Sequence, residues 1–488
     1  MTGLAFWLVL GLLPAAPDAA QIDTLVADAL RAWDVPGAAV VVVSADRVVH
    51  CKGYGVRELG GKPVTADTVF PLASCSKAFT TALLAALADD RKLTWDDPVR
   101  KHLPDFHLSD PAADALVNLR DLVAHRTGVG SHDLLWYRAP WSQEEQIRRV
   151  GKLPLSRPFR TEMQYQTVMY VAAGHAAARA GGKPWDALLR ERLLKPLGMT
   201  GVALTTQDAK KRPDWSAGHR AGKDGRLAVV PWYEQPEPNP AGSVHASARD
   251  LAPWLRLHLN RGAHDGDRLI SEASLRETHN PHTVVRMAES ARAMNPETQQ
   301  ISYGLGWVVQ DYRGRLLLMH AGLIDGFRAH ITLMPKDGYA FAILANREGT
   351  RMNLALSNAL TDLLLDLPPK DWNKYLLGVL ADEEADVRRR ARQDDLGRRP
   401  DLTTTVPLDR LAGTYVDDAY GTANIREAKG ELVWEWGTWK VPLEHYARDT
   451  FRMKSDYDPL NGIFVRFVVE DGSPREMRLP VVTFRKAK

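Results

Sequence analysis

Residues 71–80 read Pro-Leu-Ala-Ser-Cys-Ser-Lys-Ala-Phe-Thr, and this stretch follows a strand-like run and opens an apolar helix. If the helix begins at or just after Ser74, Lys77 lies one turn further on the same face, so its amine can reach the Ser74 hydroxyl. Serine is a weak nucleophile until a base accepts its proton, and a lysine desolvated inside a protein loses enough proton affinity to act as that base. The stretch therefore predicts a nucleophile beside its base.

Chance is the alternative explanation of this motif, because a Ser-x-x-Lys tetrapeptide should occur about once in a chain of this length. Two observations favour the catalytic interpretation. Ser74 is the only serine with a lysine three residues later, and residues 80–87 (Thr-Thr-Ala-Leu-Leu-Ala-Ala-Leu) are almost wholly apolar. Strong helix formers in an apolar run are typical of a helix buried in a core, whereas a chance motif would more often lie on a polar helix.

The composition is that of a globular protein with room for two domains, with 488 residues of which 45% are hydrophobic. The formal net charge is only +3, which argues against a nucleic-acid-binding protein, because such proteins concentrate a basic excess. The two cysteines, Cys51 and Cys75, provide neither a disulfide framework nor a Cys-x-x-Cys metal or redox motif. Cysteine usage leaves the cellular compartment open.

The first twenty residues speak to the compartment more directly. Residues 4–13 form an uninterrupted apolar run that is too short to span a bilayer comfortably, and Pro14 and small residues follow it. We interpret residues 1–20 as a secretory signal and expect a protein exported to the periplasm or the medium, with no stable membrane span after processing. No Lys or Arg precedes the run and no Ala-x-Ala site precedes Gln21, so a membrane-associated start is the alternative.

Strand patterns occur at both ends of the first domain and helical patterns in its middle. Strands are expected at residues 38–44, 47–55, 306–312, 316–320, 327–334 and 339–346, helices from about 84 to 209, and a closing helix at 352–365. This order predicts an α+β fold with one mostly antiparallel sheet, assembled from both ends of the domain around an inserted helical region. The interface between the two halves is the expected site of a cleft.

The remainder of the chain predicts a linker helix and a small all-β domain. An apolar stripe from Trp372 to Leu380 precedes an arginine run at 388–390, which we interpret as a solvated helix face. Short strand runs follow at 421–426, 431–436, 463–469 and 476–484, with hairpin turns at Lys429-Gly430 and Asp471-Gly472. The predicted boundaries are therefore 21–366 for the first domain, 367–404 for the linker helix and 405–488 for a β-barrel.

Three short motifs follow one another in the order of a known superfamily. They are Ser74-Cys75-Ser76-Lys77, Tyr165-Gln166-Thr167 and His320-Ala321-Gly322, and supporting stretches lie at 122–128, 240–243, 303–307 and 325–327. The chain resembles the serine β-lactamases and penicillin-binding-protein-like hydrolases, nearest the branch of class C β-lactamases, D-aminopeptidases and esterases. The resemblance covers about residues 22–366, and the tail from 411–415 onward resembles a small β domain often appended to such hydrolases.

The resemblance implies an acyl-transfer mechanism. Ser74 is then the nucleophile, Lys77 holds or takes its proton, and Tyr165 is the partner base and later the acid. Cationic neighbours would favour the phenolate form of Tyr165. The oxyanion would be held by the backbone N–H groups of Ser74 and Leu323, the residue after Gly322.

Two positions bear on the substrate that the resemblance implies. His320, which we expect to line the site, stands where β-lactam-processing relatives have lysine, and with an ordinary pKa near ~6.5 it carries little charge at neutral pH, so a substrate carboxylate gains less from it. Thr167 stands where the branch has asparagine and lacks the amide that would hold a substrate amide group. Ser243 and Arg328 are further candidates for the cleft.

Other chemistry finds little support in the sequence. There is no Gly-x-Ser-x-Gly elbow and no His-Glu-x-x-His motif, and His279 and His282 flank an expected loop without further ligands. No cofactor and no metal is implied. We therefore predict an exported serine hydrolase that acts on a small ester or peptide substrate, with weak or absent β-lactamase activity. The alternative is an inactive relative that binds cell-wall peptide or a protein partner, and the oligomeric state stays open.

Overall fold

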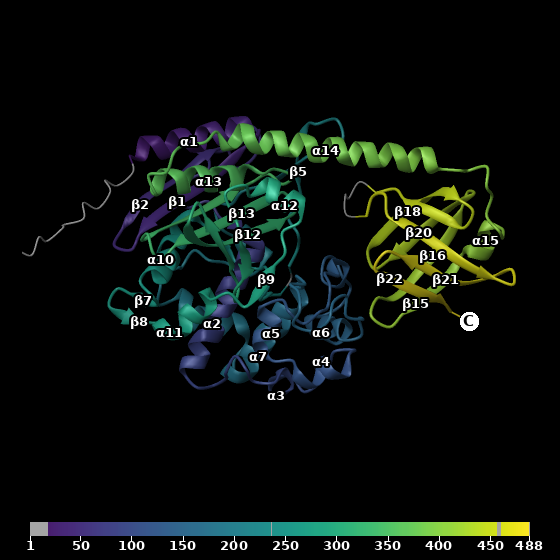
Figure 1. Ribbon diagram of the computed structural model, residues 1–488, viewed down its shortest axis with the longest axis horizontal. Coiled ribbons are helices and arrows are strands. Elements are labelled where there is room, and N and C mark those ends of the chain that lie inside the picture. Colours follow the sequence, from purple (N-terminus) through teal and green to yellow (C-terminus); the bar gives the residue numbers. More distant parts are fainter. Residues whose placement is uncertain (1–17, 236, 456–459, 488) are drawn as a thin grey trace, which may run out of the picture.

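An eight-stranded antiparallel sheet forms the centre of the first domain (Figure 1). The computed structural model describes residues 18–235, 237–455 and 460–487, so all but the last three residues of the predicted signal segment lie outside the described residues. The sheet order is β2-β1-β14-β13-β12-β11-β10-β9. The bounds are β1 Gly37–Ser44, β2 Val48–Gly55, β9 Thr283–Val285, β10 Ile301–Tyr303, β11 Val308–Tyr312, β12 Arg315–Ile324, β13 Phe327–Met334 and β14 Tyr339–Ala345. The predicted α+β class is confirmed.

The first strand joins the two ends of the domain. β1 pairs with β14 in a register that sets Val41 opposite Ala342. Its run of valines is buried on both faces, because Val40 and Val42 belong to one core cluster and Val41 and Val43 to the other. A continuous apolar run is what a strand covered on both faces requires. Helices α1 (Ala19–Ala32) and α13 (Met352–Leu364) cover one face, and α10 (Ala248–Leu259) covers the other.

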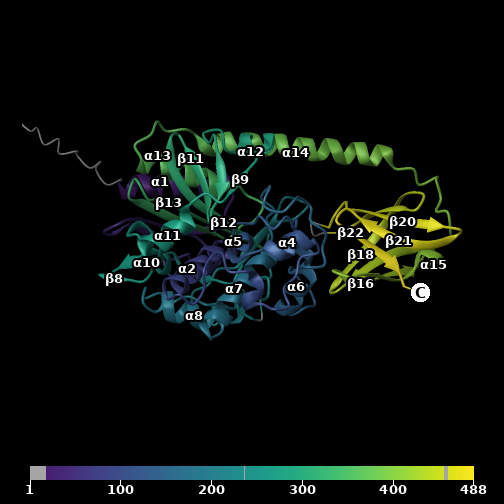
Figure 2. The same ribbon diagram turned by 60° about the horizontal axis from the view of Figure 1, so that its bottom comes forward.

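The helical region lies below the sheet in Figure 2, and its first two elements contain Ser74 and Lys77. Its elements are η1 Ala73–Cys75, α2 Ser76–Asp89, α3 Val99–His102, α4 Pro111–Leu116, α5 Leu119–Val123, η2 Asp133–Leu135, α6 Gln143–Val150, α7 Thr167–Gly181, α8 Trp185–Leu189, η3 Arg190–Leu194 and α9 Thr206–Lys210. The most central of these is α2, in which every residue from Ser76 to Leu87 is buried, as its apolar composition predicts.

A closed eight-stranded barrel makes up the second domain. Its strands are β15 Gly413–Asp417, β16 Gly421–Ala428, β17 Glu431–Trp436, β18 Trp439–Ala447, β19 Thr450–Met453, β20 Phe464–Glu470, β21 Ser473–Leu479 and β22 Val482–Lys486. Both predicted hairpin turns are present, and all four of their residues have positive φ, which favours glycine, asparagine or aspartate. The run predicted at 476–484 is two strands, because a turn separates β21 from β22.

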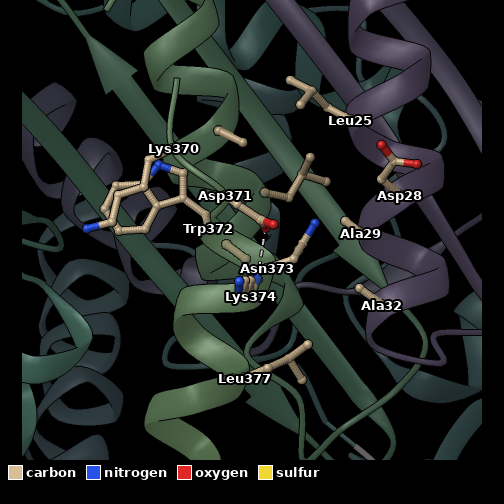
Figure 3. A pocket seen from close by; sticks show the side chains of 13 residues that line it. Leu25, Asp28, Ala29, Ala32, Lys370, Asp371, Trp372, Asn373, Lys374 and Leu377 are labelled. Carbon is tan, nitrogen blue, oxygen red and sulfur yellow. Dashed lines mark hydrogen bonds between the residues drawn. The ribbon is translucent and has the colours of Figure 1, made fainter. Parts of the chain in front are cut away.

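The helix α14 (Trp372–Gly397) runs from the first domain to the barrel (Figure 1). Trp372 and Leu376 are buried in the core cluster shared with α1 and α13, while the arginine run at 388–390 is exposed. Between α1 and the first turns of α14 lies a cavity of about 550 Å³, in which Trp372 and Lys370 flank Asp371 (Figure 3). None of the predicted catalytic residues lines this cavity.

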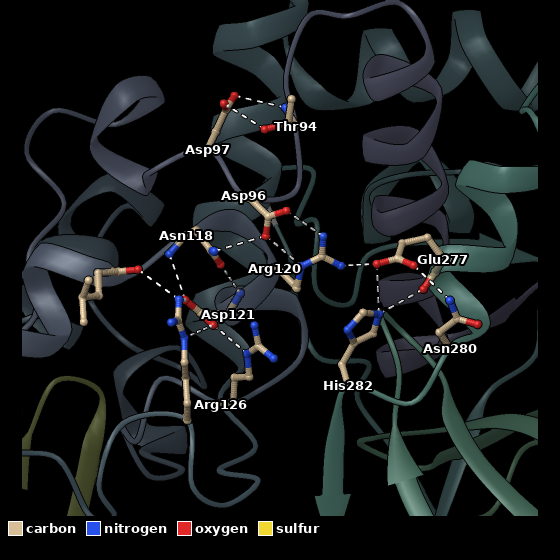
Figure 4. A network of polar contacts seen from close by, with 12 residues as sticks. Thr94, Asp96, Asp97, Asn118, Arg120, Asp121, Arg126, Glu277, Asn280 and His282 are labelled. Atoms are coloured by element: carbon tan, nitrogen blue, oxygen red, sulfur yellow. Dashed lines mark hydrogen bonds and ion pairs between the residues drawn. The ribbon is translucent and has the colours of Figure 1, made fainter.

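A buried carboxylate holds the loop that leads toward the site. Asp121 on α5 is fully buried, and its oxygens accept hydrogen bonds from Arg126 Nε at 2.6 Å, Arg160 Nη2 at 2.7 Å and the backbone N–H of Asn118 at 3.0 Å (Figure 4). The adjacent Arg120 pairs with Glu277 of α11 (Glu272–His279) and ties the helical region to the helix before β9. The network fixes the position of the chain from α5 onward.

Replacing Asp121 by alanine should destabilise the first domain by about 2–4 kcal/mol, because it leaves two arginines and a helix N-terminus without their acceptor. Scanning calorimetry should show a thermal midpoint several degrees lower. Asp96→Ala is the matched control, since Asp96 also pairs with an arginine but its side chain is 68% exposed, and an exposed pair contributes at most about 1 kcal/mol. Equal shifts in the two variants would contradict this account.

Candidate active site

Ser74 lies in a tight turn between β3 (Phe70–Pro71) and α2. The preceding Ala73 has φ of 46°, in the left-handed region that residues other than glycine rarely adopt and that costs about 1–3 kcal/mol. This turn starts α2 at Ser76, two residues after Ser74, and leaves Ser74 only partly buried while Cys75 and Ser76 are buried. Nothing in the sequence signals the unusual backbone at Ala73.

Lys77 reaches Ser74 as the spacing predicts. The distance from Lys77 Nζ to Ser74 Oγ is 3.0 Å, and Nζ also donates to the carbonyl oxygen of Ala241 at 3.1 Å. The Lys77 side chain is wholly buried. Burial lowers its pKa to about 7, and the distant Asp133 opposes the shift only in part. At neutral pH a large fraction of the amine is therefore unprotonated and able to accept a proton.

A cluster of uncharged rings causes the desolvation of Lys77. The amine lies 4.9 Å from the ring centroid of Tyr165 and 5.5 Å from that of Tyr170. Behind them His125 packs at 4.2 Å from Tyr165 and 4.8 Å from Tyr303, and burial holds the pKa of His125 well below its usual range. The rings give Lys77 no carboxylate partner, so its charged form is disfavoured.

Tyr165 differs from the expectation in its protonation. Burial raises its pKa above the ordinary value, and the hydrogen bond with Ser74 opposes the shift only in part. The expected phenolate is therefore wrong for the free enzyme. The cationic neighbour that should have favoured it is Lys77, whose own charge is weakened by burial. Tyr165 is a neutral phenol that can donate a proton and accept one in exchange.

His320 lies one layer behind the cavity, packed against Tyr303, so it does not line the site as expected. Its side chain is 4% exposed, its Nε2 lies 3.0 Å from the Tyr303 hydroxyl, and its Nδ1 lies 2.7 Å from the carbonyl oxygen of Ala321. Burial, helped by the charge of Lys77, lowers the pKa of His320 to about 3. The ring is neutral throughout the physiological range, more completely than an ordinary histidine would be.

Gly322 brings β12 against the turn that carries Ser74. A Cβ at this position would lie 2.1 Å from the carbonyl oxygen of Leu72, so only glycine allows the approach. β11 pairs with β12 only as far as Met319, which leaves the edge beyond it open toward η1. Leu323 follows on this edge, and it lines the same cavity as Ser74. The arrangement suits the predicted oxyanion site, whose donors remain a prediction.

The cavity at Ser74 has a volume of about 460 Å³. It is lined by Ser74, Asp133, Trp136, Tyr137, Tyr165, Thr167, Arg220, Leu323, Ile324, Asp325, Arg328, Glu348 and Gly349. Thr167 is the first residue of α7, whereas the neighbouring Gln166 turns away to cap that helix and to bond the Gly130 carbonyl. The middle position of the Tyr-Gln-Thr motif is therefore structural.

One end of the cavity is charged. Arg220 pairs with Glu348, and the Tyr137 hydroxyl lies 2.7 Å from each carboxylate oxygen of Asp325, to which it donates its single hydrogen. Arg328, a candidate from the sequence, does line the cavity, and its buried Nε has no hydrogen-bond partner among the described residues. Ser243, the other candidate, does not line the cavity, because it is fully buried in a turn where its hydroxyl forms hydrogen bonds with the backbone of Asn239.

Several lining residues have no signal in the sequence. These residues come from loops and a short strand that are far apart in the chain, and no local spacing connects them. They are Trp136, Tyr137, Arg220 and Glu348. Asp325 is the exception, since it opens one of the supporting stretches of the resemblance. Among the described residues, no cluster of three or more His, Cys, Asp or Glu side chains is arranged to hold a metal ion.

The family follows from a match to a known sequence model, which covers residues 22–365 and is described as beta-lactamase. The chain belongs to the β-lactamase family. It is a serine hydrolase of this family, as the motifs predicted. Residues 398–487 match a domain of unknown function (DUF3471), which corresponds to the barrel.

Relatives of this β-lactamase-family chain include unguisins hydrolase ungD' of Aspergillus campestris, which is 30% identical over 431 residues that span 83% of the chain and 77% of the relative. The octameric penicillin-binding protein homologue from Pyrococcus abyssi superposes with a TM-score of 0.64 at 19% identity, over 96% of this chain and 99% of the other. The D-amino acid amidase from Ochrobactrum anthropi SV3 does so with a TM-score of 0.58 at 21% identity, over 71% and 97%. At these identities the two structures show the shared fold.

In the described part of the chain, no helix combines the length and the apolar character that crossing a bilayer requires. The predicted signal segment lies outside that part, and export stays a prediction.

Proposed function

We propose that the protein hydrolyses an ester or amide through an acyl-enzyme on Ser74, with an esterase or D-amino-acid peptidase type of specificity. The observation that carries this proposal is the 3.0 Å contact between the Ser74 hydroxyl and the Lys77 amine, whose pKa burial lowers to about 7. A buried amine with a pKa near neutrality beside a partly exposed serine is the base that a serine nucleophile needs.

The proposed reaction has two halves. In the first, the Lys77 amine takes the Ser74 proton while Oγ attacks the carbonyl carbon, and the oxyanion is held by the N–H groups of Ser74 and Leu323. Tyr165 donates its proton to the leaving group as the bond breaks and is reprotonated from Lys77. In the second half, water attacks the acyl-enzyme, the same groups take its proton, and the acid product leaves with Ser74 restored.

The neutral His320 bears on the substrate class. With a pKa of about 3 it presents no positive charge behind the cavity, and Thr167 offers no amide, so neither of the contacts expected for a β-lactam substrate is available. The differences at His320 and Thr167 do not alter Ser74, Lys77 or Tyr165, the groups that would perform acylation. The name of the Aspergillus relative as an unguisins hydrolase and the likeness to a D-amino acid amidase agree with ester or amide substrates other than β-lactams.

We expect short-chain p-nitrophenyl esters or D-amino-acid p-nitroanilides to be hydrolysed with a higher kcat/KM than a chromogenic cephalosporin. The three substrates are compared at neutral pH with the same enzyme preparation. If the cephalosporin were the best by tenfold or more, which is about 1.4 kcal/mol of preferential transition-state binding, the interpretation of His320 would be wrong.

The alternative is an inactive relative that binds a cell-wall peptide or a protein in the same cavity. Thr167 is the residue that favours it. A fluorophosphonate probe separates the two, since an activated Ser74 reacts covalently and an inactive one does not.

A further inference from the structure

Two further cavities adjoin the cavity at Ser74. A second, small cavity is lined by Ser74 and Lys77 together with Gln235 and Asn239. Gln235 and Asn239 also line a third cavity of about 420 Å³, and Trp136 lines all three. The three cavities therefore adjoin one another at shared walls, and we call them together the groove; Arg328 lines one end of it and the third cavity forms the other.

The third cavity, which we call the junction chamber, lies where the first domain meets the barrel. It is lined by Trp136, Arg138, Ala139, Trp141, Gln143, Gln146, Trp232, Tyr233, Glu234, Gln235, Glu237, Asn239 and Thr438. Four of these side chains are large aromatics and four are amides. Its volume is in the range of pockets that bind small ligands, and aromatic walls with a few amide groups suit a peptide carrying an aromatic side chain.

The barrel supplies part of the chamber and supports the rest. Thr438 lies in the two-residue turn between β17 and β18. At the neighbouring Gly437, an added Cβ would lie 3.4 Å from the Cδ of Pro140, so this turn packs against the first domain. On the same side, Trp436 packs edge-on against Trp141 with ring centroids 5.3 Å apart. The barrel thus reaches the loop of residues 131–141, which also lines the cavity at Ser74.

Two hydrogen bonds fasten this loop and α6 to the barrel. His132 Nδ1 lies 2.8 Å from the Tyr420 hydroxyl, and Arg149 Nη1 donates to the carbonyl oxygen of Ala419 at 2.9 Å. The Arg149 guanidinium also lies over the ring of Trp141 at 4.2 Å. These contacts hold one wall of the groove in a fixed position, which a specific subsite requires.

We propose that the junction chamber is a subsite for an aromatic side chain of a peptide substrate whose scissile bond lies at Ser74, and that the barrel completes this subsite. The proposal rests on the proposed function and extends it, because it names an extended peptide as the substrate class. It also gives the barrel a role in substrate selection. Small esters that do not reach the chamber are hydrolysed independently of it.

The test fills the chamber from either side. Thr438→Trp fills it from the barrel and Ala139→Phe fills it from the first domain, and neither residue touches Ser74 or Lys77. Thr422→Trp is the matched control, because Thr422 is an exposed residue of the same barrel outside the groove. The substrates are capped peptide p-nitrophenyl esters and peptide amides, each made in D and L form. Each substrate has either Trp or Ala at the tested position. The tested positions are the first and second residues on either side of the scissile bond.

The wild-type enzyme should prefer Trp over Ala by tenfold or more in kcat/KM at one of these positions. Both filling variants should lose at least fivefold of that preference, whereas the control should keep it, and each preference is calculated within one variant so that a general change in turnover cancels. The proposal is overturned if the filled variants keep the preference, if the wild type shows none, or if oligomers of N-acetylglucosamine compete for the chamber and tryptophan peptides do not.

A binding measurement separates this proposal from the proposed function. Calorimetric titration of Ser74→Ala with a capped tryptophan peptide needs no turnover. Binding that Thr438→Trp abolishes in this background would support the chamber even if no substrate were hydrolysed. If neither Ser74→Ala nor the double variant with Thr438→Trp binds the peptide, while the probe labels Ser74 in the wild type, the proposed hydrolase function is supported and the proposed subsite is wrong.

Discussion

Ser74→Ala should lower kcat/KM for every substrate by about 10⁴-fold or more, because the serine oxygen forms the covalent intermediate and no neighbouring group can replace it. The change removes one hydroxyl from a partly exposed side chain, so the thermal midpoint should stay within about a degree of the wild type. A fluorophosphonate probe followed by peptide mapping should label Ser74 in the wild type and nothing in the variant.

The nearest serine provides the control for this experiment. Ser76 lies two residues further along, at the start of α2; it is fully buried and accepts a hydrogen bond from the backbone N–H of Val244 at 3.0 Å. Ser76→Ala should lose some stability and still be labelled at Ser74. Labelling at another serine in the wild type, or turnover in Ser74→Ala close to that of the wild type, would end the acyl-enzyme proposal.

Lys77→Arg should inactivate the enzyme nearly as fully as Lys77→Ala, by about 10³-fold or more, because a guanidinium stays protonated and cannot take the serine proton. In the wild type, kcat/KM should rise with pH through an apparent pKa near the value of about 7 that burial imposes on Lys77, since the unprotonated amine is the reactive form. A pH profile of a good ester substrate measures both effects. Substantial activity in the arginine variant would mean that the lysine acts only as a fixed charge.

The same lowered pKa predicts a cost in stability. In the unfolded chain a lysine has an ordinary pKa near ~10.4, so between about pH 7 and pH 10 the unfolded state binds more protons than the folded state, and stability rises with pH across that window. Lys77→Met should therefore raise the thermal midpoint at neutral pH while abolishing turnover, with a gain that shrinks toward pH 10. Lys92→Met, at an exposed site after α2, should do neither.

Local spacing explains why the catalytic pair could be predicted. Ser74 and Lys77 are one helical turn apart, and the strands and helices of the first domain follow from patterns within short windows. Tyr165 and His320 came from the order of motifs along the chain. The resemblance therefore supplied what spacing alone could not, namely which distant residues meet the pair.

What could not be predicted depends on tertiary contacts. The neutral state of Tyr165 and the depth of His320 arise from rings contributed by several elements, and no single window contains them. The strand β12 continues to Ile324, four residues beyond the predicted end at His320, because its far half pairs with β13. The junction chamber combines residues from both domains, and no pattern in either domain alone indicates it.

The pairing of β1 with β14 has a consequence for how the chain folds during synthesis. Val41 meets Ala342, so the ribosome must add about three hundred residues before the first strand has its partner. At typical elongation rates of about 5–20 residues per second, that interval is roughly 15 to 60 s. Until β14 is available, β1 can pair only with β2, and the valines that the complete sheet buries have no cover, which exposes the incomplete chain to aggregation. The large sequence separation of this strand pair is the kind of non-local contact that slows folding.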